Sequence, residues 1–378
     1  MLIKNGKVFL LEEKGFVKRD ILLEGKIIKE ISQEIKGDAY YDANGKYIMP
    51  GLIEAHSHIG MWEEGIGSEG DDGCESYSPI TPGVRAIDAI NPFDEAFNEA
   101  LHGGVTVACS GPGSANVIGG QFAVIKIYGN VIDDMVINQY SAQKCAFGEN
   151  PKNEFGKKGN APMTRMGIAY LLRKALIEAK NYKANKGIAQ SNDEHFDIDL
   201  DKEALLKVLS KEVPLKAHVH RADDICSAIR VAKEFDIDMT LDHCTEGHLI
   251  ADYIKDSGFP VIVGPSFGSR SKIEINKKSF KTVKVLVEKG ILTAITTDHN
   301  VLPQQSLNMC AAMAVRDGLD EFEALKAITI NPAKILKIDK IKGKLAKDMD
   351  ADIVVWDNHP LDIKSKVEKV IIEGEEVI

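Results

Sequence analysis

The sequence predicts an α/β protein: a (β/α)8 TIM barrel that carries a small β domain built from both ends of the chain. Three observations predict this architecture. Short apolar runs alternate with amphipathic stretches through the middle of the chain, strand-like runs occupy both ends, and 378 residues with 44% apolar content can form a full-sized core. We expect residues 1–50 and 340–378 to form the β domain and residues 51–339 to form the barrel domain.

The two ends of the chain share one pattern. Leu2–Leu10 and Asp20–Ile31 alternate apolar and polar residues, and a turn at Gly25 interrupts the second run. Ala351–Trp356 and Val367–Glu373 show the same alternation at the other end. Because neither end has helical periodicity, we expect strands from both ends to join one β domain.

The middle of the chain alternates predicted strands and helices. Asp223–Phe235 and Lys278–Gly290 are amphipathic, and another helix is expected to start at an Asn91 N-cap and stop at Gly103. Repeated βα units predict a parallel sheet covered by helices, and the length of this segment suits closure into a barrel. The predicted strands are Val105–Ser110, Phe122–Tyr128, Pro214–Val219, Met239–His243, Pro260–Gly264 and Ile291–Asp298.

Composition narrows the range of partners. Lys and Arg number 47 against 57 Asp and Glu, which gives a formal net charge of −10 and argues against nucleic-acid binding. No apolar run approaches the roughly 18 residues of a membrane span, and polar residues enter too early after Met1 for a signal peptide. The six cysteines contain no CxxC pair and suggest reduced thiols. We expect a cytoplasmic protein without a membrane partner; homo-oligomer formation stays open.

The histidines indicate a metal centre. His56 and His58 form an HxH pair, and residues two apart on a strand point to the same face. His218, His243 and Asp298 each end a predicted strand, where barrel proteins build their active sites. Five nitrogen and oxygen donors at one end of the barrel favour zinc, with iron or manganese as alternatives, as one or two ions per chain.

These motifs resemble the amidohydrolase superfamily over essentially the whole chain. Pro50–His58 is similar to its first-strand metal motif, His218 and His243 match the histidines of its fifth and sixth strands, and Asp298 matches the aspartate of its eighth. Ala327–Lys334 resembles the helix that returns to its β-sandwich. The resemblance implies a distorted (β/α)8 barrel with a small β-sandwich from both chain ends, and it is strongest to imidazolonepropionase-like and prolidase-like members.

The ligand set suggests a hydrolase. A metal-activated hydroxide would attack an amide or cyclic amide of a small-molecule substrate, and Asp298 would carry the proton to the departing nitrogen. Esters and ring deamination stay open as alternative reactions. His220, Arg221 and His299 follow the metal-binding candidates and are expected to contact substrate.

A two-metal site needs a bridging anion, which in this superfamily is often a carboxylated lysine or a glutamate. Glu149 is favoured because it stands at the end of its run, immediately before Asn150-Pro151. Lys144 and Lys126 are the alternatives, and either would have to be carboxylated before it could bind metal.

Other readings of the same residues stay open. One is a non-catalytic amidohydrolase-like barrel used for binding or assembly, although relatives without metal usually lack several of these histidines. Another is a deaminase or isomerase that uses the same metal site. The glycine-rich Gly111–Gln121 region is expected to shape the barrel mouth, and Glu63–Glu75 is a candidate lid.

Overall fold

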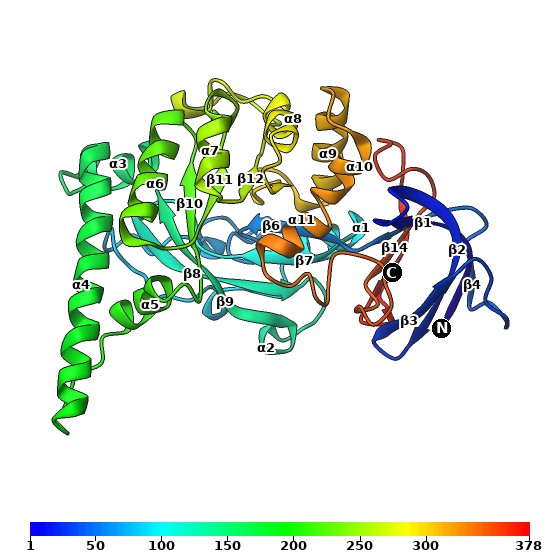
Figure 1. Ribbon diagram of the computed structural model, residues 1–378, viewed down its shortest axis with the longest axis horizontal. Coiled ribbons are helices and arrows are strands. Elements are labelled where there is room, and N and C mark those ends of the chain that lie inside the picture. Colours follow the sequence, from blue (N-terminus) through cyan, green and yellow to red (C-terminus); the bar gives the residue numbers. More distant parts are fainter.

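The computed structural model describes residues 1–378 and contains two eight-stranded sheets. Figure 1 shows a barrel surrounded by helices, with a smaller sheet beside it that holds both chain termini. None of the helices combines the length and the apolar character needed to cross a bilayer.

The smaller sheet joins the two ends of the chain. Strand β14 pairs antiparallel with β5, so that Val354 lies opposite Met49. Ile3, Ile48 and Ile353 are fully buried and belong to one apolar cluster beneath this sheet. The prediction of a second β unit built from both ends is therefore confirmed. Its strands are β1 (Leu2–Leu10), β2 (Gly15–Glu24), β3 (Ile27–Ser32), β4 (Tyr41–Asp42), β5 (Tyr47–Pro50), β14 (Ile353–Trp356), β15 (Val367–Ile372) and β16 (Glu375–Glu376).

The larger sheet forms the nearly closed barrel that the sequence predicts. Its strands follow in chain order, and the first and last approach each other, where the Thr296 hydroxyl donates to the His56 carbonyl across 2.8 Å. The strands are β6 (Leu52–Ser57), β7 (Val105–Ser110), β8 (Ile118–Lys126), β9 (Val136–Ala146), β10 (Leu215–Val219), β11 (Met239–His243), β12 (Val261–Val263) and β13 (Thr293–Ile295).

One strand distorts the barrel. Strand β8 runs antiparallel to both β7 and β9, whereas all other neighbouring strands are parallel. Residues 111–117 connect β7 to β8, and a segment this short makes a hairpin rather than a helical crossover. The sequence predicts uniform βα units here, and the structure differs because this connection is too short for a helix.

Helices cover the outside of the barrel (Figure 1). Helix α1 begins after Asp94, whose carboxylate accepts the Ala96 N–H, so the N-cap lies three residues beyond the expected Asn91. The long α4 projects past the barrel at its C-terminal end. The helices are α1 (Glu95–His102), α2 (Ile132–Met135), α3 (Glu149–Glu154), α4 (Arg165–Ser191), α5 (Leu200–Leu209), α6 (Ala222–Phe235), α7 (Ala251–Ser257), α8 (Lys281–Glu288), α9 (Leu307–Arg316), α10 (Glu321–Lys326) and α11 (Ile330–Ile335).

Candidate functional site

Five side chains at the C-terminal ends of four parallel strands meet at one place. Asp298 Oδ1 lies 3.4 Å from His56 Nε2 and 3.3 Å from His58 Nε2. The His243 ring is 4.9 Å from the His56 ring and 4.4 Å from the His218 ring, measured between centroids. The structure thus brings together the five donors that the sequence singles out.

Three of the imidazoles are held by hydrogen bonds from Nδ1. His56 Nδ1 lies 2.6 Å from Asp242 Oδ2, His58 Nδ1 2.6 Å from the Gly111 carbonyl, and His243 Nδ1 2.8 Å from the Gly264 carbonyl. A carbonyl or carboxylate only accepts, so each Nδ1 carries the hydrogen and each Nε2 keeps its lone pair. Metal-binding histidines are typically oriented in this way.

The charge states of these groups fit a cation. Burial lowers the pKa of His56 and of His218 well below the usual histidine range and also lowers that of His243, which favours the neutral form of these rings. Burial alone would raise the pKa of Asp298, but His243 and His58 bring it below the usual range. Asp298 Oδ1 and His218 Nδ1 are buried without a hydrogen-bond partner. A buried carboxylate among imidazole lone pairs is the donor set that a divalent metal ion satisfies.

The fourth barrel strand brings Lys144, rather than Glu149, to this group. Lys144 is fully buried, and its Nζ lies 3.5 Å from His56 Nε2. Strand β9 ends at Ala146, and Gly148, with a φ of +86°, turns the chain into α3, which Glu149 opens. Glu149 uses its backbone N–H to bond Glu274 Oε2 across 3.0 Å. The two groups of metal-competent atoms, His56–His243–Asp298 and His218–His220–Glu274, contain no atom of Glu149.

Lys126 lies at the other end of the barrel. It is the last residue of β8, and because β8 is antiparallel this strand ends where its neighbours begin. Its Nζ lies 3.4 Å from Glu373 Oε1, next to the smaller sheet.

Two buried carboxylates, Asp242 and Glu54, hold the segments that carry the five donors. No local sequence pattern marks either of them. Asp242 Oδ2 lies 3.1 Å from Lys216 Nζ, and its Oδ1 accepts the Thr240 hydroxyl across 2.8 Å. Glu54 accepts the Thr297 N–H and hydroxyl across 2.9 and 2.7 Å, which ties strand β6 to the segment that carries Asp298. Burial raises the pKa of Glu54 to about 7.

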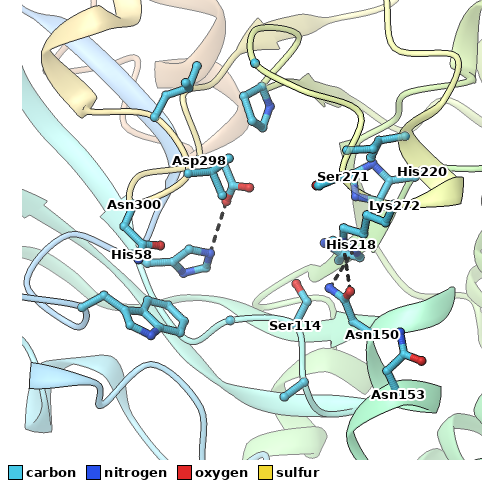
Figure 2. Close-up of a pocket in the computed structure, with 18 of the residues that line it drawn as sticks. His58, Ser114, Asn150, Asn153, His218, His220, Ser271, Lys272, Asp298 and Asn300 are labelled. Atoms are coloured by element: carbon cyan, nitrogen blue, oxygen red, sulfur yellow. Dashed lines mark hydrogen bonds and ion pairs between the residues drawn. The ribbon is translucent and has the colours of Figure 1, made fainter. Parts of the chain in front are cut away.

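A cavity of about 810 Å³ opens over the group and is lined by His58, His218 and Asp298. Figure 2 shows Asp298, His58 and Asn300 on one side and His218, Asn150, Lys272 and His220 on the other. Two other predicted features also line it: Trp62 and Cys74 at the borders of the candidate lid, and Gly113 and Ser114 of the glycine-rich region.

The three expected substrate contacts fall in different places. His220 lines the cavity, and its ring stacks on His243 at 4.9 Å between centroids. Arg221 does not line it; its Nε and Nη2 donate to the Asp223 carboxylate, each across 3.1 Å. His299 is buried beside Asp298, outside the cavity lining, and neither ring nitrogen has a partner.

Glu274 and Lys272 belong to the site although sequence reasoning did not find them. Glu274 is buried, and its Oε1 lies 3.7 Å from His218 Nε2, 3.8 Å from His220 Nε2 and 2.9 Å from Lys272 Nζ. Burial would raise the pKa of Glu274, but His220 and Lys272 bring it below its usual value. Both residues come from the lysine-rich segment after β12, which has no periodicity to mark it.

Comparisons with known proteins agree with this geometry. The model of the amidohydrolase family matches residues 47–377. The amidohydrolase tasK of Hapsidospora irregularis is 30% identical over 94% of this chain, which spans only 39% of that protein. The imidazolonepropionase of Picrophilus torridus is 26% identical, over 94% of this chain and 91% of the relative. The crystal structure of an amidohydrolase from Thermotoga maritima superposes with a TM-score of 0.97 at 40% identity, over 100% of this chain and 99% of that one.

Proposed function

Because the chain belongs to the amidohydrolase family, we propose that it is a metal-dependent hydrolase that cleaves the C–N bond of an amide or cyclic amide. The observation that carries the proposal is the convergence of four histidines and Asp298 at one place, where His58, His218 and Asp298 line a cavity. We place His56, His58 and Asp298 around one ion, and His218 and His243 around a second. Zinc suits this set of imidazole and carboxylate ligands.

A bound divalent cation would lower the pKa of water and polarise the carbonyl oxygen of the substrate. The chain's own contribution begins with Asp298, whose side chain lines the cavity and remains 12% exposed. Its anionic form can accept the proton of the attacking water. The same carboxyl group then donates that proton to the leaving nitrogen.

The bridging ligand in this proposal is Lys144. The neutral Nζ would add to CO2 and release a proton, which leaves an anionic carbamate with two oxygens. Its position beside His56 supports the role, and burial lowers the pKa of Lys144 to about 8, so the reactive amine is accessible near neutral pH. No comparable observation supports Glu149, because its carboxylate belongs to neither of the two groups of metal-competent atoms.

The test combines metal analysis with a hydrolysis panel of N-acyl amino acids, lactams and esters. His56→Ala together with His58→Ala should lose bound metal and activity in parallel. His102→Ala removes an exposed histidine outside the site and serves as the matched control. Full metal content in the double variant would refute the assignment. Metal-loaded wild type that is inert on the whole panel would favour the non-catalytic barrel, and ammonia release from ring amines alone would favour a deaminase.

A further inference from the structure

The lining of the cavity holds more lysines than carboxylates, in a chain whose net charge is −10. Three lysines line the cavity: Lys157, Lys272 and Lys278. Lys278 Nζ donates to the carbonyls of Phe267 and Ser269 across 2.8 and 2.7 Å, so no carboxylate neutralises it. Lys157 has no acidic partner within 4 Å, and Glu154, which also lines the cavity, pairs with Lys158. An uncompensated charge of this kind raises the local concentration of anions.

Lys272 is held in a fixed position in this lining. Its Nζ donates to Glu274 Oε1 across 2.9 Å and to Asn150 Oδ1 across 2.8 Å. An ammonium group has three N–H donors, so one remains available. Its partner Glu274 is buried and also bonds the backbone of Glu149, which anchors the lysine to the barrel.

Asn150 supplies a second donor beside the first. Its Nδ2 lies 3.4 Å from His218 Nε2, which uses one of its two N–H groups. The other N–H makes no hydrogen bond, and it belongs to the amide whose Oδ1 accepts from the Lys272 ammonium. Figure 2 shows Asn150 and Lys272 together across the cavity from Asp298. Two adjacent donors match the two oxygens of a carboxylate.

We propose that the substrate carries a carboxylate that binds to Lys272 and Asn150, while its scissile C–N bond lies at Asp298. The proposed substrate class is therefore a carboxylated amide, such as an N-acyl amino acid or a lactam acid. This inference rests on the proposed hydrolase function for the bond cleaved, but the recognition of the anion does not depend on turnover. Lys272 and Asn150 then determine specificity, and Lys157 and Lys278 attract the anion.

Trp62 provides a readout that needs no catalysis. Its ring lines the cavity 5.0 Å from the His58 ring, whereas the second tryptophan, Trp356, is buried where β14 faces Gly104 and gives a constant background. Protein as purified is titrated with N-acetylglycine and with N-acetylglycinamide, which differ only in the carboxylate. The acid should change the fluorescence at a concentration about tenfold lower than the amide, as expected for charge-assisted hydrogen bonds.

Two variants locate the anion. Lys272→Met should weaken binding of N-acetylglycine about tenfold and leave the amide unchanged, and Lys174→Met, at an exposed position of α4, is the control. Because Lys272→Met leaves Glu274 without its cation, Asn150→Ala is tested as well, with thermal melting to verify folding. The inference would be overturned if the wild type bound N-acetylglycine and N-acetylglycinamide equally well. It would also be overturned if both folded variants bound N-acetylglycine as tightly as the wild type, because the carboxylate would then bind the metal instead.

Hydrolysis of paired substrates separates this inference from the proposed function. Cleavage of acids and amides at equal rates, unaffected by Lys272→Met, would overturn the carboxylate site and leave the hydrolase function intact. Selective binding of the acid by Lys272 without cleavage of any C–N bond would support the carboxylate site and remove the hydrolase function.

Discussion

His56 and Asp242 form a fully buried pair, with 2.6 Å between Nδ1 and Oδ2. His56 lies in the first barrel strand and Asp242 in the sixth, so the bond spans the interior of the barrel. Lys216 compensates the charge of Asp242 from the neighbouring fifth strand across 3.1 Å. The pair fixes the His56 ring so that Nε2 faces Asp298.

Asp242→Asn should therefore weaken metal binding without removing a ligand. The carboxylate raises the basicity of His56 and selects the Nδ1–H tautomer, and its loss should reduce metal affinity by about 10- to 100-fold. Competition with a chelator measures the affinity, and Asp193→Asn at an exposed position is the control. Unchanged affinity in the Asp242→Asn protein would show that the pair has no influence on the metal.

Asp298→Asn should preserve the fold and abolish most turnover. The amide cannot accept the proton of water or return it to the leaving nitrogen, so kcat should fall by a factor on the order of 10² to 10⁴. Because Asn keeps one oxygen for the metal, the loss of bound metal should be smaller than the loss of kcat. The experiment compares kcat, metal content and thermal melting, and near-normal kcat would exclude Asp298 as the proton carrier.

The grouping of the five donors could be predicted from sequence because each donor follows a local apolar run. The sequence predicts the bounds of β7 and β11 to the residue, because each begins with apolar residues at alternate positions. It does not mark β9, because polar residues fill most of that strand's interior, among them Asn138, Gln139, Gln143 and Lys144. The Gln143 amide is satisfied only in the folded barrel, by the carbonyls of Gly119 and Gly120. The local sequence around Gln143 does not predict these hydrogen bonds.

The polar character of β9 also explains why the sequence favours Glu149. A strand that ends at Ala146 places Lys144 near its C-terminal end, and no local pattern marks this strand, whereas Glu149 immediately precedes Asn150-Pro151. Lys272 and Glu274 carry no signal for a related reason: the contacts that bring them into the site join distant parts of the chain, as in the bond from Lys272 to Asn150, 122 residues away. Long-range polar contacts of this kind become apparent only in the fold.

Asp224 should make stability depend on pH. It is 3% exposed, its Oδ2 has no partner, and burial raises its pKa to about 6. A carboxyl group whose pKa is higher in the folded state binds its proton more tightly when folded, so its destabilising effect is full above pH 6 and disappears as pH falls towards 4. Asp224→Asn should raise Tm by about 2–4 °C at pH 8 and by less at pH 5. Asp193→Asn, at an exposed position away from Asp224, is the control, and an equal Tm gain at both pH values would contradict the mechanism.

The bridging ligand can be tested with Lys144→Ala and Glu149→Gln. If the Lys144 carbamate joins the two ions, Lys144→Ala should reduce bound metal from two ions towards one per chain and lose most activity, whereas Glu149→Gln should change neither. Apo-protein supplied with zinc should recover only partial activity until bicarbonate is added, because the bare ammonium has no lone pair for a metal. Metal content and activity are measured on the same samples.

The opposite pattern, in which Glu149→Gln loses metal and activity and apo-protein recovers fully without bicarbonate, would assign the bridge to Glu149. If neither variant changes metal content or activity, the result would indicate a single ion held by His56, His58 and Asp298.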